Sequence, residues 1–150
     1  MSVAPFLPSA EEIIIRMLDI AELKAGETLY DLGCGDGRIL IIAAQEYGAK
    51  AVGIELNPDL ASKAKINVKS HRLEERVHIV NKNFFDVDFS PAHVVTMYLT
   101  QLAADALQTK FKKELHKGTR IVSHNYEVGS WRPELISGHP SGHRIILYRM

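Results

Sequence analysis

The sequence predicts an α/β domain: a mostly parallel β-sheet with helices on both faces, closed by a C-terminal antiparallel hairpin. Short apolar runs alternate with amphipathic runs, an alternation typical of parallel strands joined by helices. A glycine-rich turn directly follows the first apolar run. The alternation stops after His124, where two strand-like runs flank Pro140-Ser141-Gly142. These observations together favour one domain over residues 1–150.

Each element follows from its local pattern. Val3 to Pro8 form a proline-rich apolar arm, which is expected either to cover a cleft or to pack on the sheet. Ser9 to Glu12 form a capping box for a helix that is expected to end near Leu23. Strands are expected over 28–32, 51–55, 77–81, 93–98 and 119–124, with hairpin strands over 134–137 and 144–148. Helices are expected over 38–47, 58–72 and 101–115.

Composition and charge narrow the functional class. The chain has 18 basic and 18 acidic side chains, and this zero net charge argues against binding nucleic acid by bulk electrostatics. A single cysteine, Cys34, excludes an internal disulfide and fits a reducing compartment, so we expect a cytoplasmic protein. We expect no signal peptide and no membrane insertion, because no apolar run approaches membrane-spanning length. Of the seven histidines only His139 and His143 are closely spaced, so no metal site is expected.

The most informative stretch is YDLGCGDGRI at residues 30–39. Gly33, Gly35 and Gly37 stand between an expected strand and an expected helix, which is the arrangement of a nucleotide-binding corner. Glycines suit this corner because the backbone must bend sharply and a ligand must approach without meeting a Cβ. Arg38 stands where a dinucleotide fingerprint needs its third glycine, and no Gly-Lys-Ser/Thr sequence follows. The turn therefore fits a cofactor that lacks a pyrophosphate.

An acidic residue ends the next expected strand. Glu55 follows Ala51 to Ile54, and a carboxylate there offers two acceptor oxygens to the two hydroxyls of a ribose. Asn57 and Pro58 are suited to the N-cap and first position of the following helix. A solvated strand end is the alternative for Glu55 alone, and its place relative to the glycine turn favours ribose binding.

Together these motifs resemble the class I, seven-β-strand S-adenosylmethionine-dependent methyltransferases. The chain is most similar to the small archaeal and bacterial protein-lysine methyltransferases, whose relatives include mitochondrial enzymes. The shared features run from Pro5 to Glu134: PFLPS, YDLGCGDGRI, VGIELNP, NFF, VVTMYL, GTRIVSHNYE and SWRPE. The resemblance implies a Rossmann-like sheet of seven strands, S-adenosyl-L-methionine as cofactor and a protein substrate that presents a lysine.

The resemblance also assigns cofactor-binding residues by their positions in the motifs. Those expected at the methionine end of the cofactor are Asp31, Gly33, Gly35 and Gly37. Glu55 would hold the ribose, and Asn83 and Phe84 would meet the adenine. Many family members have Asp where this chain has Asn83, and either side chain accepts a hydrogen bond from the exocyclic amine. Of Phe84 and Phe85, one is expected in the core and one on the adenine.

Three candidates for the acceptor side follow the fourth and fifth parallel strands. Tyr98 would orient or deprotonate an amine, His124 would take up a proton, and Glu127 would attract an ammonium group. Trp131 would pack either against the alkyl stem of that amine or in the core of the hairpin. The alternatives for Tyr98 and His124 are a core aromatic and an ordinary hydrogen-bonded histidine. The fourth strand also lacks the Asn/Asp-Pro-Pro-aromatic motif of enzymes that methylate exocyclic base amines.

Two other functions stay open from the sequence. An RNA methyltransferase would use two basic helices whose cations are Lys63, Lys65, Lys69, Arg72, Lys110, Lys112, Lys113 and Lys117. These cations are otherwise a solvated surface near helix C-termini, and the neutral net charge disfavours RNA. A non-catalytic S-adenosylmethionine-binding domain is disfavoured by the intact glycine turn and by Glu55.

Overall fold

The computed structural model describes residues 10–150, so the expectations for the arm at 1–8 and for Ser9 lie outside the described residues. Within this range seven strands form one sheet in the order β3-β2-β1-β4-β5-β7-β6. The strands are β1 Thr28–Leu32, β2 Lys50–Ile54, β3 Val77–Val80, β4 Val94–Met97, β5 Arg120–His124, β6 Leu135–Gly138 and β7 Arg144–Arg149. The helices are α1 Glu11–Ile20, α2 Arg38–Tyr47, α3 Pro58–Ser70, η1 Phe84–Asp86, α4 Gln101–Ala106 and α5 Gln108–Glu114.

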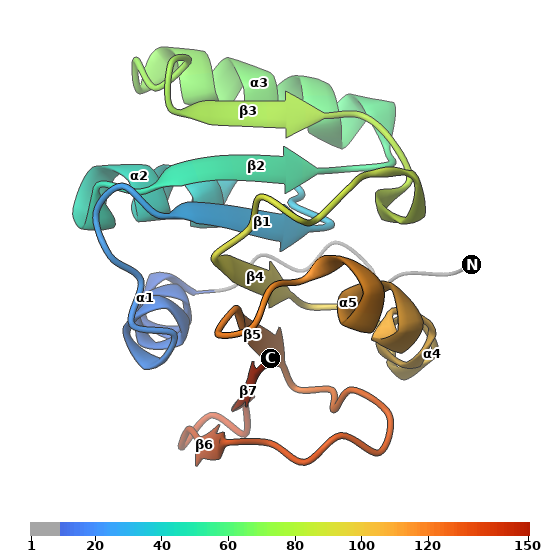
Figure 1. The fold of residues 1–150 in the computed structure, drawn as a ribbon. Coiled ribbons are helices and arrows are strands. Elements are labelled where there is room, and N and C mark those ends of the chain that lie inside the picture. The colour runs from blue at the N-terminus through green and yellow to red at the C-terminus, as the bar shows by residue number, and fades with distance from the viewer. Residues whose placement is uncertain (1–9) are drawn as a thin grey trace.

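The strand directions confirm the predicted sheet (Figure 1). Strands β1 to β5 pair in parallel, whereas β7 runs antiparallel to both β5 and β6. The observed strands begin and end within one residue of the expected ranges. Because β7 lies between β5 and β6, the C-terminal hairpin extends the parallel sheet on the β5 side.

Helices cover both faces, and each face has its own hydrophobic core. Helices α1, α2 and α3 pack on one face, and η1, α4 and α5 pack on the other. Neighbouring strand residues point to opposite faces, so Val94 joins the first core and Val95 joins the second. The alternation along the strands therefore buries the sheet on both sides, as the sequence predicted.

One expectation for the helices was wrong in detail. The single helix expected over 101–115 is divided at Leu107, whose N–H donates to the carbonyls of both Ala103 and Ala104 at 3.1 and 3.3 Å. This tightened turn keeps both Leu107 and Phe111 fully buried in the second core. Among the described residues, the N-cap of α1 is Ala10, which makes no side-chain capping hydrogen bond.

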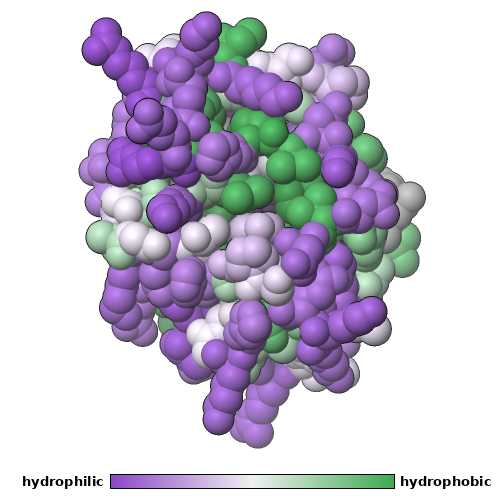
Figure 2. Space-filling view, turned by 45° about the horizontal axis from the view of Figure 1, so that its top comes forward, coloured by the Kyte–Doolittle hydropathy of each residue, from purple (hydrophilic) through white to green (hydrophobic). Residues whose placement is uncertain are grey.

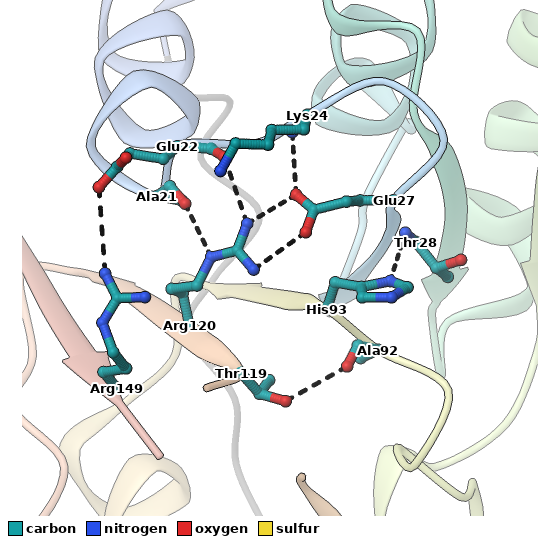
Figure 3. A network of polar contacts seen from close by, with 10 residues as sticks. All are labelled: Ala21, Glu22, Lys24, Glu27, Thr28, Ala92, His93, Thr119, Arg120 and Arg149. Carbon is teal, nitrogen blue, oxygen red and sulfur yellow. Dashed lines mark hydrogen bonds and ion pairs between the residues drawn. The ribbon is translucent and has the colours of Figure 1, made fainter. Parts of the chain in front are cut away.

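A largely buried ion pair lies at the amino ends of β1 and β5 (Figure 3). Arg120, at the start of β5, is 8% exposed and lies 2.6 Å (Nη2) and 3.1 Å (Nη1) from the two carboxylate oxygens of Glu27. Its guanidinium also donates to the carbonyls of Ala21 at 3.0 Å and Glu22 at 3.2 Å. Burial alone would raise the pKa of Glu27, but the hydrogen bonds from Arg120 and the Lys24 backbone lower it overall. The contacts join β5 to the segment between α1 and β1.

Candidate active site

The carboxyl ends of the parallel strands bring the predicted residues to one edge of the sheet. Leu32 of β1 is in register with Ile54 of β2 and Met97 of β4, and Met97 is in register with Ser123 of β5. The residues that come next in the chain therefore follow one another along this edge in the order Glu55, Gly33, Tyr98 and His124. Ligands of open α/β sheets bind at such an edge.

The glycine turn has the backbone conformation that its sequence requires. Gly33, Gly35 and Gly37 have φ angles of 77, 57 and 86°, in the left-handed region. At Gly37, the N-cap of α2, a Cβ would also lie 3.3 Å from the Cβ of Ala64, which is tighter than an ordinary contact. The N–H groups of Gly33 and Cys34 donate to the carbonyl of Ile54 at 2.8 and 3.0 Å, which joins the turn to the end of β2.

Cys34, inside this turn, faces the protein interior. Its side chain is 6% exposed, and burial raises the pKa of its thiol well above the usual range. A Cβ on Gly53 would lie 2.7 Å from the Cys34 sulfur, so the glycine in β2 makes room for this thiol. Cys34 is therefore a packing residue.

Glu55 is held in a fixed orientation by backbone donors. The carboxylate is buried, and it accepts the N–H of Gly35 at 2.8 Å on one oxygen and the N–H of Asn57 at 2.9 Å on the other. Asn81 donates its side-chain amide to the carbonyls of Glu55 and Leu56 at 2.8 and 3.1 Å. Asn81 was not among the residues predicted from the sequence. Each carboxylate oxygen has a further lone pair for a ligand.

Asp31 is buried beneath the turn with a neutral partner. Thr96 donates its hydroxyl to Asp31 at 2.8 Å from the neighbouring strand β4. Burial raises the pKa of Asp31 to about 7; the hydrogen bond from Thr96 works against the rise, and the charge of Glu55 adds to it. Asp36 differs, because its contact with Arg38 at 2.8 Å outweighs the effect of burial and lowers its pKa. Within residues 10–150, neither Asp31 nor Glu55 forms an ion pair.

A small cleft lies on the β2–β3 side of the glycine turn. Its lining residues are Gly33, Ile54, Glu55, Leu56, Asn83, Phe84 and Phe85. Asn83 uses its side-chain oxygen to cap η1, accepting the N–H of Phe85 at 3.0 Å. Phe84 is buried and Phe85 half-buried, with ring centroids 4.9 Å apart. Figure 2, which brings the β3 side of the sheet forward, shows apolar side chains gathered between hydrophilic margins on this side of the molecule.

Tyr98 and His124 lie together on the other side of the turn. Their ring centroids are 4.0 Å apart, and Tyr126 stacks on Tyr98 at 6.5 Å. His124 Nε2 lies 2.7 Å from Nδ1 of His143, which precedes β7. Burial, and secondly the charge of His143, lower the pKa of His124 to about 4. From the sequence, His143 was considered only as a metal ligand; the pairing of β5 with β7 is what brings the two histidines together.

Glu127 and Trp131 each contact other side chains of the protein. Glu127 Oε1 is 4.0 Å from the guanidinium of Arg144, so its charge is already shared with a cation. Trp131 packs between Phe111 and Tyr148, with centroids 6.1 and 6.0 Å away, which favours the core alternative for this residue.

Within the described range 10–150, no group of three or more His, Cys, Asp or Glu side chains is arranged to hold a metal ion. Over the same residues, no helix has the length and apolar character needed to cross a membrane.

Comparison with known proteins places these features in a family. The family model described as the ANTKMT methyltransferase domain matches residues 31–135. The chain is 42% identical over 148 residues to a protein-lysine N-methyltransferase of Saccharolobus islandicus, covering 96% of this chain and 92% of that protein. It is 29% identical to the adenine nucleotide translocase lysine N-methyltransferase of Mus musculus, covering 89% of this chain but only 58% of that protein's length.

The fold is also similar to solved structures that contain a demethylated cofactor. An RNA methyltransferase from Salinibacter ruber in complex with S-adenosyl-L-homocysteine superposes with a TM-score of 0.92 at 36% sequence identity. This similarity covers 95% of this chain and 93% of the Salinibacter chain.

Proposed function

The chain belongs to the ANTKMT methyltransferase domain family, and we infer that it transfers the methyl group of S-adenosyl-L-methionine to lysine ε-amino groups of a protein. The observation that carries the substrate class is the 42% identity to a protein-lysine N-methyltransferase, which spans nearly the full length of both chains. The single buried cysteine fits a reaction in a reducing compartment such as the cytoplasm.

The charges at the carboxyl edge support a cofactor position beside the glycine turn. S-adenosyl-L-methionine carries a sulfonium and an ammonium group, and both would lie near the turn that contains Asp31, Gly33, Gly35 and Gly37. Asp31 and Glu55 are buried carboxylates with neutral hydrogen-bond donors, so a cationic ligand supplies the charge that they lack. In this proposal Glu55 binds the ribose through its remaining lone pairs.

The adenine would occupy the cleft beside Asn83. One lone pair of the Asn83 oxygen accepts the N–H of Phe85, and the second remains for the exocyclic amine of adenine. The Phe84 and Phe85 rings line the same cleft and provide an apolar surface for the base.

The acceptor amine would enter beside Tyr98. Methyl transfer is an in-line displacement, so alignment of the amine lone pair with the methyl–sulfur bond contributes much of the rate. A lysine with an unperturbed pKa of about 10.4 must first lose a proton. Tyr98 would orient the amine, His124 would take up its proton, and Glu127 would attract the ammonium group from the surface.

The second candidate is an RNA methyltransferase. It is favoured by the Salinibacter structure, which is 36% identical and is described as an RNA methyltransferase. The exposed cations Lys63, Lys65 and Lys69 on α3 would then contact phosphates.

Incubation with radiolabelled S-adenosyl-L-methionine and a cell extract separates the two candidates. After ribonuclease or protease treatment, we expect the label to remain with protein and to appear as methyl-lysine on amino-acid analysis. Label found only in RNA would refute lysine methylation and promote the second candidate. The matched control is Glu46→Ala, an exposed carboxylate on α2 that should leave labelling at the wild-type level.

A further inference from the structure

Two histidines connect the acceptor side of the edge to the protein surface. His124 is 1% exposed, whereas His143 is only half-buried. His124 Nε2 and His143 Nδ1 are 2.7 Å apart, and the ring centroids are 4.7 Å apart. At this distance one imidazole donates a hydrogen bond to the other, so a proton already bridges the buried ring and the outer ring.

The backbone around His143 is held on both sides. Asn125, at a φ of 73°, accepts the N–H of Arg144 on its side-chain oxygen at 2.9 Å and donates its own N–H to the Arg144 carbonyl at 2.8 Å. The N–H of His139 donates to the carbonyl of His143 at 2.8 Å. The hairpin therefore holds His143 in position, and the contact with His124 does not depend on an unanchored loop.

The charged side chains near the His124–His143 pair lie close to side chains of opposite or titratable charge. Glu127 is 4.0 Å from Arg144, and Glu12 is 3.6 Å from His139. On the side of β4, the ring of Tyr98 packs against His124, with ring centroids 4.0 Å apart and an interplanar angle of 32°. Burial keeps His124 neutral near pH 7, since its pKa is lowered to about 4.

We propose that the His124–His143 pair conducts the proton lost by the acceptor lysine from the buried edge to solvent. This rests on the proposed lysine methylation and assigns His143 a role in it. One proton leaves the ammonium group for the His124 ring while the shared proton moves to His143, which releases it to water. The freed lone pair forms the N–C bond, and the S–C bond breaks with its electron pair on sulfur. One proton is released for each methyl group transferred.

The first test is the rate of methyl-lysine formation by His143→Asn, with ribonuclease-treated extract protein as substrate. Asn keeps a hydrogen bond to His124 but cannot carry a proton, so we expect about a tenfold or larger loss of kcat near neutral pH. The loss should shrink at alkaline pH, where the amine deprotonates without help. Imidazole in the buffer should restore part of the rate of His143→Ala. Cofactor affinity, measured by calorimetry, should stay at the wild-type value in both variants.

The matched control is His116→Asn, because His116 is exposed at the opposite end of the sheet and should leave the rate unchanged. A wild-type rate for His143→Asn across the pH range would refute the proton path and leave the histidines as a structural contact. Absence of methyl-lysine with the wild-type enzyme would instead refute the proposed function, so the two failures are distinguishable.

A second measurement needs no substrate. In protein labelled with 15N-histidine, we expect NMR titration to show that His124 stays neutral below its ordinary pKa of 6.5. Protonation of His124 before His143 would contradict the proposed direction of transfer. This readout applies to the wild-type protein, so it is independent of how the variants fold.

Discussion

The two ends of the sheet differ in the partners of their carboxylates. At the amino end, the carboxylate of Glu27 meets the guanidinium of Arg120, with two nitrogen–oxygen contacts of 2.6 and 3.1 Å. At the carboxyl end, Asp31 and Glu55 meet only a hydroxyl and backbone N–H groups in the described part of the chain. The pKa of Glu27 is accordingly lowered, while that of Asp31 is raised to about 7.

This difference between the two ends predicts which substitutions change stability and which change ligand binding. The amino end contains both partners of its ion pair, so the chain compensates the charge without any ligand. The carboxyl end keeps negative charge in a low-dielectric site, where a cationic ligand interacts more strongly than it would in water. We therefore expect substitutions at the amino end to change the free energy of unfolding, and substitutions at the carboxyl end to change binding and pH dependence.

The largest effect is expected for Arg120→Met. Removing one partner of a buried ion pair strands the other charge and costs about 3–5 kcal/mol of unfolding free energy. Denaturant titration of the free protein measures this loss. The control is Arg149→Met, whose exposed pair with Glu134 should contribute less than about 1 kcal/mol. Equal losses for the two variants would contradict the assigned role of Arg120.

Asp31→Asn should stabilise the free protein increasingly as pH rises. In the wild type the folded-state pKa of Asp31 is about 7, above its ordinary value of 3.8, so the folded state binds more protons between these values. Its stability contribution is therefore lost as pH rises through this window. Asparagine does not ionise, so the variant avoids this loss of unfolding free energy, which reaches up to about 4 kcal/mol above neutral pH.

Unfolding measurements at about pH 4 and about pH 8 check this prediction. The contribution of His124 to stability changes with pH in the opposite direction. Because its pKa is lowered in the folded protein, stability rises with pH up to the unfolded-state pKa near 6.5. That contribution is common to wild type and variant and cancels in their difference. A difference that does not change with pH would show that Asp31 is already ionised in the folded protein.

Glu55→Ala should weaken cofactor binding by about 1–3 kcal/mol, the range for polar groups that lose a buried partner. Calorimetry with S-adenosyl-L-methionine and S-adenosyl-L-homocysteine measures the change. Glu55→Gln keeps one acceptor oxygen and should fall between wild type and alanine. Unchanged affinity in a folded alanine variant would remove Glu55 from the binding site.

The smallest effect is expected for Glu127→Ala. Because Glu127 shares its charge with Arg144 at 4.0 Å and is partly exposed, we expect KM for the protein substrate to rise only about two- to fivefold, with kcat unchanged. Added salt should reduce the difference between variant and wild type. A fall in kcat instead would place Glu127 at the reacting atoms.

The sequence predicts well those features that depend on neighbours in the chain. The strand ranges, the positive φ angles of Gly33 and Gly37, and the N-cap of Asn57 all follow from local chemistry. The break at Leu107 was missed, since the helical pattern continues through it and only tertiary packing divides the helix.

Contacts across long sequence separations were not predictable in the same way. Thr96 meets Asp31 over 65 residues, and His143 meets His124 over 19 residues and a change of strand direction. Both depend on strand register, which a single sequence specifies only through the pattern of buried faces. The sequence thus placed the candidate residues along one edge of the sheet, while the partners that set their protonation states required the structure.

The burial of Cys34 has a practical consequence for fluorescence experiments. It is the only cysteine in the sequence, and its thiol stays protonated and shielded within the glycine turn. A maleimide dye should therefore leave the native protein unlabelled and react at a single introduced position, such as Leu102→Cys on the exposed face of α4. A fluorophore there would report ligand and substrate binding in real time, without first removing the native thiol.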